Sequence, residues 1–347
     1  MDTLTTRLSR AAVWTGSGID VRDIPVPVLD EGEILVRVQL ATVCGSDLHT
    51  VSGRRSAACP SVLGHEAVGV VEAIGGASNG TVDVGDRIVW SVTVACGTCP
   101  RCGAGRTAKC ERVRKVGHEP FDGRWPLSGS YAQHIVLPAG TAVARIPDTL
   151  PDAVAAPAAC ATATVMAAIA AAALVTPDAT SPLRDRRVLI CGAGMLGVTA
   201  AAACADAGAQ IRITDIDPAR LGLARRFGGV RDTGGPVDVV LDFSGAADAI
   251  ADGLDRLDVG GVLVLAGSVA PGPALSIDPE SVVRRLVTIT GVHNYEPRHL
   301  AAAIDLLNRT RNVFPWSEVV AEPVSLDELS DVFSAPPSGT LRRSVAP

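Results

Sequence analysis

Aromatic residues are scarce in this sequence and make up only 3% of its 347 residues. A stacking platform for single-stranded nucleic acid needs exposed aromatic side chains, so we do not expect one. Positive charge is also in deficit, because the formal net charge is −6. An acidic chain disfavours a polyanion as the main partner, although it leaves room for a local basic pocket. The composition therefore argues against a nucleic-acid partner.

Long hydrophobic runs are almost missing as well. The first residues carry charges at Asp2, Arg7 and Arg10, so a secretory signal is not expected. The longest uncharged segment, 153–177, is dominated by alanine and contains Pro157. This composition favours a buried helix over a membrane span. The sequence predicts a cytoplasmic protein with no membrane partner.

The residues that are present suffice for large buried cores. Hydrophobic residues make up 47% of the chain, and its length favours two domains. The first 150 residues alternate short β-branched runs with Gly, Pro and Asp turns, whereas Ala-rich helices then alternate with apolar strands. The second pattern indicates a doubly wound parallel sheet, preceded by an exposed connection at 176–186. We expect strands at 34–38, 67–74, 87–94, 187–191, 211–214, 237–241 and 261–266, and helices at 196–207, 218–227 and 246–257.

Four of the nine cysteines form the clearest chemical signal. They are Cys96, Cys99, Cys102 and Cys110. Two-residue gaps let successive thiolates turn back onto one ion, and the fourth cysteine completes a tetrahedron around zinc. Because four thiolates leave no open coordination position, we expect a structural zinc site. Free thiols on a loop or an iron–sulfur cluster are the alternatives.

A second group of possible metal ligands is dispersed along the chain. It consists of Cys44, His65 and Cys160. Two thiolates and one imidazole would bind zinc and leave a fourth position for water or substrate. Asp47 could accept the other ring N–H of His65 and fix its tautomer. Considered singly, the two cysteines also fit small buried residues, and the histidine fits a hydrogen-bonded core residue.

The segment Val188–Gly197 contains G-x-G-x-x-G directly after an apolar strand and at the start of a helix. This arrangement is typical of a dinucleotide-binding turn, in which the helix N-terminus faces the pyrophosphate. Asp215 ends the next strand, where a carboxylate binds the ribose of NAD and repels the 2′-phosphate of NADP. Arg220 could lie over the same ribose and allow some NADP. The residues assigned to the cofactor are Gly192, Gly194, Met195, Leu196, Gly197, Asp215 and Arg220.

Taken together and in this order, the motifs CGSDLH, GHE and CGTCPRC, then a later Cys before GAGMLG, resemble the zinc-dependent alcohol dehydrogenases of the medium-chain dehydrogenase/reductase family. The resemblance covers nearly the whole chain. It implies an α/β plus β fold, in which a GroES-like β-barrel catalytic domain is formed by residues 1–161 and 296–347. A Rossmann domain, residues 162–295, is inserted between these parts. The resemblance also implies a homodimer or homotetramer.

The resemblance further implies roles for individual residues and two zinc ions per chain. Cys44, His65 and Cys160 correspond to the ligands of a catalytic zinc, and Glu66 to a carboxylate that can approach the same metal. Ser46 and His49 correspond to a proton relay. Thr164 corresponds to a residue that packs near the nicotinamide. Some relatives have a glutamate as third ligand at a position where this chain has Ala156, which leaves Cys160 as the candidate.

The implied reaction is hydride transfer between NAD(H), favoured over NADP(H), and a small alcohol with its aldehyde or ketone. The stretches 117–132 and 155–164 are similar to a subgroup associated with phosphonate metabolism. Cations in the segment 111–125, Arg124 above all, could therefore hold an anionic, phosphonate-bearing substrate. A solvated surface or an oligomer contact is the alternative explanation of those cations.

Three other functions fit parts of the pattern. A zinc-bearing reductase of C=C bonds is disfavoured because Ser46 and His49 are both present. A polyol or amino-alcohol dehydrogenase would use the same residues on another substrate. A non-catalytic NAD-binding sensor is disfavoured most, because the metal, relay and cofactor positions are all intact.

Overall fold

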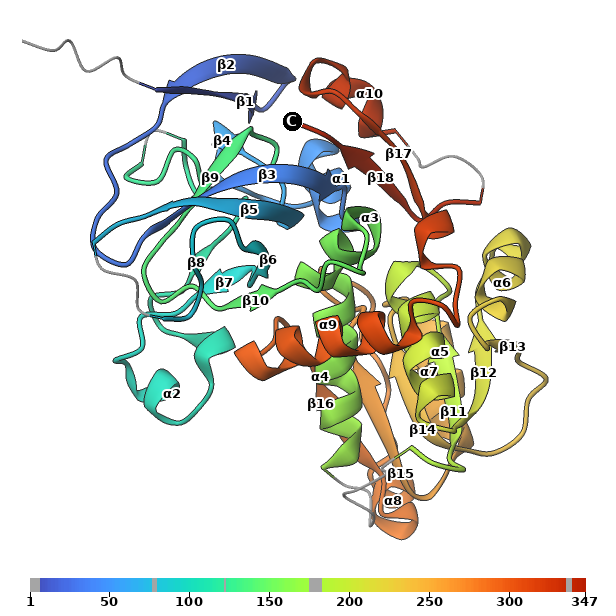
Figure 1. Ribbon diagram of the computed structural model, residues 1–347. Coiled ribbons are helices and arrows are strands. Elements are labelled where there is room, and N and C mark those ends of the chain that lie inside the picture. Colours follow the sequence, from blue (N-terminus) through green and yellow to red (C-terminus); the bar gives the residue numbers. More distant parts are fainter. Residues whose placement is uncertain (1–6, 77–79, 122, 175–182, 335–338) are drawn as a thin grey trace, which may run out of the picture. The chain divides into compact units, whose positions relative to one another are not determined.

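The computed structural model describes residues 7–76, 80–121, 123–174, 183–334 and 339–347 (Figure 1). The chain divides into two compact units. Unit 1 comprises Met1–Cys160, Glu296–Asn308 and Ser317–Pro347, and unit 2 comprises Ala161–Tyr295 and Arg309–Trp316. The sequence prediction assigned residues 309–316 to the GroES-like catalytic domain, whereas in the structure they belong to unit 2. Of the expected connection, residues 176–182 lie outside the described residues.

Unit 1 is built mainly from antiparallel strands around β3 (Ile34–Thr42). This strand pairs with β5 (Glu66–Ile74), β9 (His134–Leu137) and β18 (Arg342–Val345). Its sequence is rich in Ile, Val and Leu, which suits a strand that is buried along most of its length. The larger sheet has the order β10-β6-β5-β3-β18-β17, and a smaller one has the order β2-β1-β4. The remaining strands of the unit are β1 (Leu8–Trp14), β2 (Ile19–Pro25), β4 (Ser61–Val62), β6 (Arg87–Trp90), β7 (Thr93–Val94), β8 (Arg114–Lys115), β10 (Val143–Arg145) and β17 (Val320–Val324).

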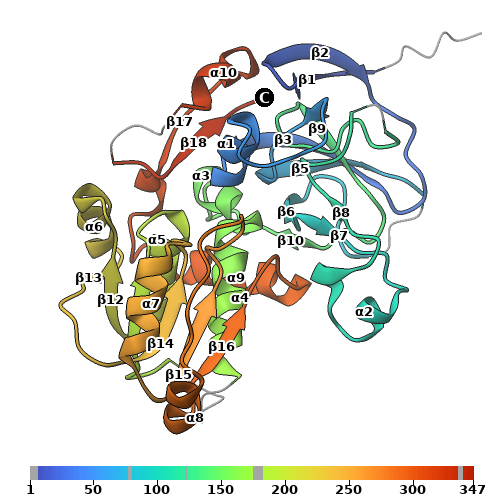
Figure 2. The same cartoon turned by 180° about the vertical axis from the view of Figure 1, so that it is seen from behind.

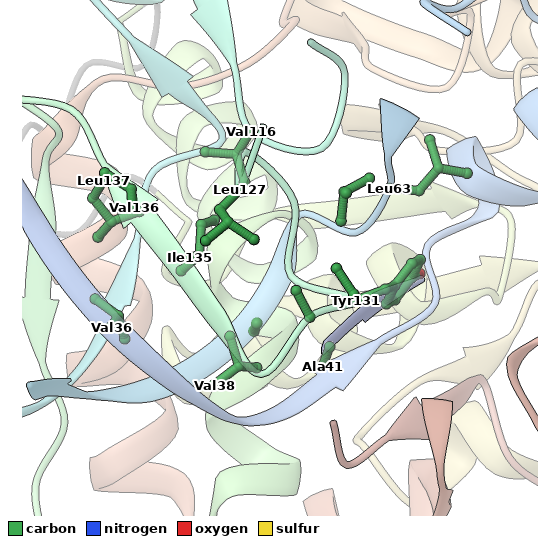
Figure 3. Packing of buried hydrophobic residues seen from close by; sticks show 14 of the residues in the cluster. Val36, Val38, Ala41, Leu63, Val116, Leu127, Tyr131, Ile135, Val136 and Leu137 are labelled. Atoms are coloured by element: carbon green, nitrogen blue, oxygen red, sulfur yellow. The ribbon is translucent and has the colours of Figure 1, made fainter. Parts of the chain in front are cut away.

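The core of unit 1 brings residues from distant strands and loops together (Figure 3). The fully buried residues include Val36 of β3, Ile135 of β9 and Leu127, which lies in the loop between β8 and β9. Helices connect or follow the strands of this unit. They are α1 (Gly45–Val51), α2 (Pro100–Gly103), η1 (Thr107–Lys109), α3 (Asp152–Ala155), η2 (Ala156–Ala159), α9 (Pro297–Thr310), which ends in unit 2, η3 (Trp316–Val319), η4 (Leu326–Glu328) and α10 (Leu329–Val332).

Unit 2 is a parallel sheet with the order β13-β12-β11-β14-β15-β16. β11 lies between β12 and β14, so the chain order reverses beside it. Right-handed crossovers therefore put α5, which leads to β12, and α7, which leads to β15, on opposite faces; Figure 2 shows α7 in front of the sheet. Ligands of such sheets bind at the carboxyl ends of the strands beside the reversal. The elements are α4 (Ala161–Ala173), β11 (Arg187–Cys191), α5 (Met195–Asp206), β12 (Gln210–Thr214), α6 (Pro218–Arg225), β13 (Val230–Arg231), β14 (Val237–Asp242), α7 (Ala247–Arg256), β15 (Leu257–Leu265), α8 (Pro279–Arg285) and β16 (Thr288–Gly291).

The expected fold class is confirmed, and the expected strands and helices occur in the described chain, with β3 extending to Thr42 instead of ending at 38. Two further differences concern strand pairing. The single strand expected at 87–94 is divided into β6 and β7. The strand expected from Gly261 begins earlier, at Leu257, where its pairing with β14 is irregular. Both differences are breaks in regular pairing that an apolar pattern does not reveal.

The uncharged alanine-rich segment forms short helices. Among the described residues no single helix is long and apolar enough to cross a membrane. Asp152–Ala159 and Ala161–Ala173 satisfy the length and composition requirements only as a pair, with a bend of 54° between them.

Three aromatic rings explain why residues 309–316 belong to unit 2. The ring of Phe227, which is fully buried, lies 5.8 Å from that of Phe314 and 5.1 Å from that of Trp316, measured between centroids. Arg309 also donates a hydrogen bond to Asp206 at 2.7 Å. The aromatic contacts and this ion pair hold the returning chain against the second unit.

Phe227→Ala should therefore destabilise unit 2. The substitution leaves a cavity next to two other rings, and we expect it to lower the free energy of unfolding by about 3–5 kcal/mol. Ile216→Ala is the control, because the Ile216 side chain is fully exposed. Chemical denaturation followed by circular dichroism measures both variants, and equal midpoints for the two would contradict this packing.

Candidate active site and metal centres

Three residues far apart in the sequence meet in unit 1. Cys44 precedes α1, His65 precedes β5, and Cys160 follows η2. Their ligand atoms all lie within 4.8 Å of one another, and we call them the three-ligand cluster. The two sulfur atoms are 3.9 Å apart. Two sulfurs bound to one zinc ion at about 2.3 Å with tetrahedral angles lie about 3.8 Å apart, so the cluster fits this ion.

Asp47 orients both Cys44 and His65. Its Oδ2 accepts a hydrogen bond from the Cys44 backbone N–H at 3.1 Å and another from the Tyr131 hydroxyl at 2.9 Å. Its Oδ1 lies 3.4 Å from Nδ1 of His65. The other ring nitrogen, Nε2, lies 3.3 Å from the Ser46 hydroxyl. A carboxylate on Nδ1 leaves Nε2 as the nitrogen that can bind a metal.

The electrostatics of the cluster favour the ligand form of Cys44. The hydrogen bond with Cys160 lowers the pKa of the Cys44 thiol well below its ordinary value, while burial opposes this change. His65 and Arg342 lower the pKa of Cys44 further. The thiolate is the form of cysteine that binds metals, so these neighbours prepare Cys44 for that role.

The Glu66 side chain is held in place by a buried ion pair beside the three-ligand cluster. Arg342 of β18 donates to the Glu66 carboxylate from Nε at 2.8 Å and from Nη2 at 3.0 Å. The Thr42 hydroxyl donates to the same carboxylate at 2.7 Å. Burial raises the pKa of Glu66, and Arg342 opposes this rise. Nη2 of Arg342 also lies 4.0 Å from the Cys44 sulfur.

The two candidate relay residues lie on α1. Ser46 and His49 are three positions apart, so they lie on the same side of the helix. Nδ1 of His49 is buried and has no hydrogen-bond partner among the described residues. This helix therefore carries a hydroxyl beside His65 and a second imidazole one turn further on.

The four clustered cysteines also converge. We call Cys96, Cys99, Cys102 and Cys110 the four-cysteine cluster, because their sulfurs lie within 4.8 Å of one another. The Cys99 sulfur lies 3.5 Å from that of Cys102 and 3.9 Å from that of Cys110. Such separations fit four thiolates on one zinc ion.

Hydrogen bonds to sulfur support this second cluster. Arg112 donates from its backbone N–H to Cys110 and from its side chain to Cys96, at 3.3 and 3.4 Å. Hydrogen bonds from Thr98 lower the pKa of Cys96 to about 5. The Glu296 carboxylate, from the returning chain, accepts the backbone N–H groups of Thr107 and Ala108 and so holds the loop. Donors to sulfur, such as Arg112 and Thr98, stabilise the negative charge of a thiolate.

The glycine turn of unit 2 has the shape expected for a dinucleotide. Gly192 has a φ of +96°, which L side chains rarely adopt. A Cβ at Gly197 would lie 1.8 Å from the Gly192 carbonyl oxygen, so only glycine lets α5 pack there. A Cβ at Gly194 would meet nothing within 4 Å, which leaves open space at the start of the helix. Met195 and Leu196 form the first turn of α5.

The acidic residue after β12 is tied to this turn. Asp215 accepts hydrogen bonds from the backbone N–H groups of Ala193, at 2.6 Å, and Asp217, at 2.8 Å. Arg220 lies 3.7 Å from Asp217. Thr164 is partly exposed on α4. These residues belong to unit 2, whereas the three-ligand cluster belongs to unit 1.

The cations of the segment 111–125 have different surroundings. Arg114 lies over the Trp125 ring, with its guanidinium carbon 5.2 Å from the centroid. Arg124 is exposed and has no ion pair to another described residue. Lys115 is half-buried.

Several residues of the site were not found from the sequence. Arg342, Tyr131 and Glu296 each reach the clusters from strands or turns far along the chain. No local motif surrounds them, so the sequence offered no signal. His118 is the exception, because Gly117-His118 repeats the Gly64-His65 pair, and the two histidine rings lie 5.2 Å apart.

Comparisons with known proteins agree with this architecture. Residues 30–148 match the alcohol dehydrogenase GroES-like domain, and residues 196–309 match the zinc-binding dehydrogenase domain. The fold matches an alcohol dehydrogenase from Thermotoga maritima with a TM-score of 0.88 and 24% identity, covering 98% of this chain and 100% of that chain. A zinc-binding dehydrogenase from Sinorhizobium meliloti, solved bound to NADP, matches with a TM-score of 0.84 and 24% identity over 98% and 100% of the two chains.

The two domain matches fall on the two parts of the chain, one on each side of Cys160. Among curated relatives, L-threonine 3-dehydrogenase from Edwardsiella ictaluri is 33% identical over 300 residues, which are 80% of this chain and 82% of the relative. The chain belongs to the zinc-dependent alcohol dehydrogenases of the medium-chain dehydrogenase/reductase family.

Substitutions in the Glu66–Arg342 pair test whether this buried ion pair stabilises the folded protein. Arg342→Met leaves the buried carboxylate without its cation, and we expect the free energy of unfolding to fall by about 3–5 kcal/mol. Combining this change with Glu66→Gln should recover part of the loss. Arg10→Met is the control, because its ion pair with Asp327 is exposed and worth at most about 1 kcal/mol. Equal losses in Arg342→Met and Arg10→Met, measured by chemical denaturation, would contradict a structural role for the pair.

Proposed function

We propose that this protein is an NAD(H)-linked dehydrogenase that interconverts a small alcohol with its aldehyde or ketone, and that each chain binds two zinc ions. The observation that carries the proposal is the three-ligand cluster with the Ser46 hydroxyl beside it. Three protein ligands leave one position open for substrate, whereas the four-cysteine cluster is closed and suits a structural ion. When bound, zinc would lower the pKa of the alcohol and NAD would accept the hydride.

The chain's own residues supply proton handling and positioning. The Ser46 hydroxyl accepts the proton of the alcohol, and His49, one turn further along α1, carries it onward. Tyr131 holds Asp47, whose carboxylate lies 3.4 Å from Nδ1 of His65, and Arg342 neutralises Glu66. The presence of a hydroxyl and an imidazole for proton removal favours alcohol oxidation over C=C reduction.

Asp215 supports NAD as the preferred cofactor. Its carboxylate stands at the end of β12, beside the glycine turn, where it can accept hydrogen bonds from the ribose hydroxyls. One structural neighbour was solved with NADP and another with NADH, so the fold by itself accommodates either cofactor. Preference must therefore come from this carboxylate and its neighbours.

Amino alcohols are a second candidate substrate class. Curated relatives are named L-threonine 3-dehydrogenase and are about as long as this chain. Threonine carries a secondary hydroxyl next to an amine and a carboxylate, so it would need charged partners in addition to the metal. A panel that contains both simple alcohols and threonine separates the two candidates.

Metal removal tests the proposed zinc sites. We expect two zinc ions per chain in the wild type and one each in Cys44→Ser and Cys102→Ser, measured by elemental analysis. NAD-linked alcohol oxidation should fall by roughly a hundredfold or more in Cys44→Ser, because the reacting oxygen loses its Lewis acid. Cys59→Ser is the control, since Cys59 is exposed and outside both clusters. Full turnover in Cys44→Ser with a retained fold would refute the assignment.

Cofactor preference gives a separate test. Asp215→Asn keeps the shape of the side chain but removes the charge that opposes a 2′-phosphate. We expect the ratio of kcat/KM for NAD over that for NADP to fall by about tenfold or more, as one charged hydrogen bond is lost. Steady-state kinetics with both cofactors measure the ratio. A wild type that prefers NADP, or an unchanged ratio, would overturn the role of Asp215.

A further inference from the structure

Glu296 joins the loop of the four-cysteine cluster to the start of α9, although its nearest contact, Thr107, lies 189 positions earlier in the sequence. The Glu296 carboxylate accepts the backbone N–H groups of Thr107 and Ala108, at 3.0 and 3.1 Å, and also the Thr107 hydroxyl. Figures 1 and 2 show α9 beginning beside the loop that follows α2. Both carboxylate oxygens are used, and hydrogen bonds to an ionised group are the strong ones. This single side chain therefore fixes the turn at Thr107.

The turn that Glu296 holds leads directly into a zinc ligand. η1 (Thr107–Lys109) is followed by Cys110, whose backbone N–H donates to the Thr107 carbonyl at 3.0 Å. Cys110 is buried, and its sulfur lies 3.9 Å from that of Cys99. Thr107 thus connects Glu296 to Cys110 through consecutive hydrogen bonds. Because outer partners orient the side chains that bind a metal, the position of the Cys110 sulfur depends on this connection.

The backbone of Glu296 also begins α9. The His299 backbone N–H donates to the Glu296 carbonyl at 2.8 Å, and the Glu296 N–H donates to Nδ1 of His299 at 3.1 Å. Burial, followed by the charge of Arg298, lowers the pKa of His299, so its neutral ring can accept this bond. His299 therefore replaces the Glu or Gln of a capping box. An N-cap side chain usually binds its own helix, whereas the Glu296 carboxylate binds the cysteine loop.

Glu296 lies where the chain enters unit 1 for the second time. Unit 2 extends to Tyr295, and unit 1 resumes at Glu296 and continues along α9 to Asn308. The apolar residues of α9 recur at helical spacing and are buried, namely Leu300, Ala303, Ile304 and Leu307. The first turn of a helix has no intrahelical partners for its N–H groups. An anchor at Glu296 therefore acts on the part of α9 that its own hydrogen bonds hold least.

We propose that Glu296 couples zinc binding at the four-cysteine cluster to the stability of the first turn of α9. This inference rests on the part of the proposed function that assigns zinc to this cluster. With zinc bound, Cys110 and the turn before it are fixed, and the turn presents its N–H groups to Glu296. Such coupling is reciprocal, so the factor by which Glu296 strengthens zinc binding is also the factor by which bound zinc strengthens the Glu296 contacts. The closed zinc site is then an anchor for the chain that returns to unit 1.

Competition with a chromophoric chelator measures one direction of the coupling. Cys44→Ser is the background, because only the four-cysteine cluster is then expected to hold zinc. We expect Glu296→Gln to weaken zinc binding by about tenfold to a hundredfold, as the loss of an outer partner does. Thr107→Val removes only the hydroxyl donor and should have a smaller effect in the same direction. Glu111→Gln is the matched control, because Glu111 is an exposed carboxylate next to Cys110 and its substitution changes the charge equally.

Hydrogen exchange at residues 299–303 measures the reverse direction in the otherwise native, zinc-loaded protein. Cys102→Ser removes the ion of the four-cysteine cluster and should raise the exchange rate of these amides by about tenfold or more. In Glu296→Gln the rate should already be high, and adding Cys102→Ser should raise it little further. Such non-additivity indicates coupling, which a merely structural role of Glu296 would not produce. The amides of β14 (Val237–Asp242) in unit 2 are the internal reference.

Equal zinc affinities in Glu296→Gln and Glu111→Gln would overturn the coupling. Additive effects of Glu296→Gln and Cys102→Ser on hydrogen exchange would overturn it as well. Faster exchange in β14 to the same extent would also count against it, because zinc would then stabilise the whole fold instead of this turn. None of these measurements needs turnover. Coupled zinc binding and exchange in a protein that oxidises no alcohol would reject the proposed activity and leave the anchor standing.

Discussion

Cys44 and Cys160 are 116 positions apart, yet their sulfur atoms lie 3.9 Å from each other and beside the His65 ring. This separation is the one that a shared zinc ion imposes, and such an ion would also hold the negative charge of two adjacent thiolates. Neighbouring residues of unit 1 hold the side chains of this cluster and the adjacent Glu66 in place. Asp47 fixes the imidazole, and Arg342 keeps the neighbouring Glu66 neutralised. The Ser46 hydroxyl lies 3.3 Å from Nε2 of His65, and in the proposed function it accepts the proton of the alcohol.

The cations that contact the residues of the two clusters are themselves paired. The Glu66–Arg342 pair is fully buried and bonded on both oxygens, and Arg112 is bonded to a thiol and a hydroxyl.

The sequence was most informative where function depends on local spacing. The four clustered cysteines and the G-x-G-x-x-G turn each lie on a single loop, so their geometry follows from neighbouring residues, and the structure brings both sets together. Family resemblance supplied the distant members, above all Cys160. Arg342 and Tyr131 could not be predicted, because β-strand pairing across the chain brings them to the site. The assignment of Arg220 to the cofactor ribose stays a prediction; its side chain lies 3.7 Å from Asp217. Residues 309–316 joined unit 2 through the Phe227 ring, a contact that no periodic pattern reports.

The central claim is that Cys44, His65 and Cys160 share one zinc ion. Anomalous diffraction from crystals of the purified protein, recorded on both sides of the zinc absorption edge, tests it directly. The account predicts a zinc peak about 2.3 Å from both sulfurs and about 2.0–2.1 Å from Nε2 of His65, in addition to a peak within the four-cysteine cluster. A peak at the four-cysteine cluster alone, with Cys44 and Cys160 joined in a disulfide or turned apart, would contradict it.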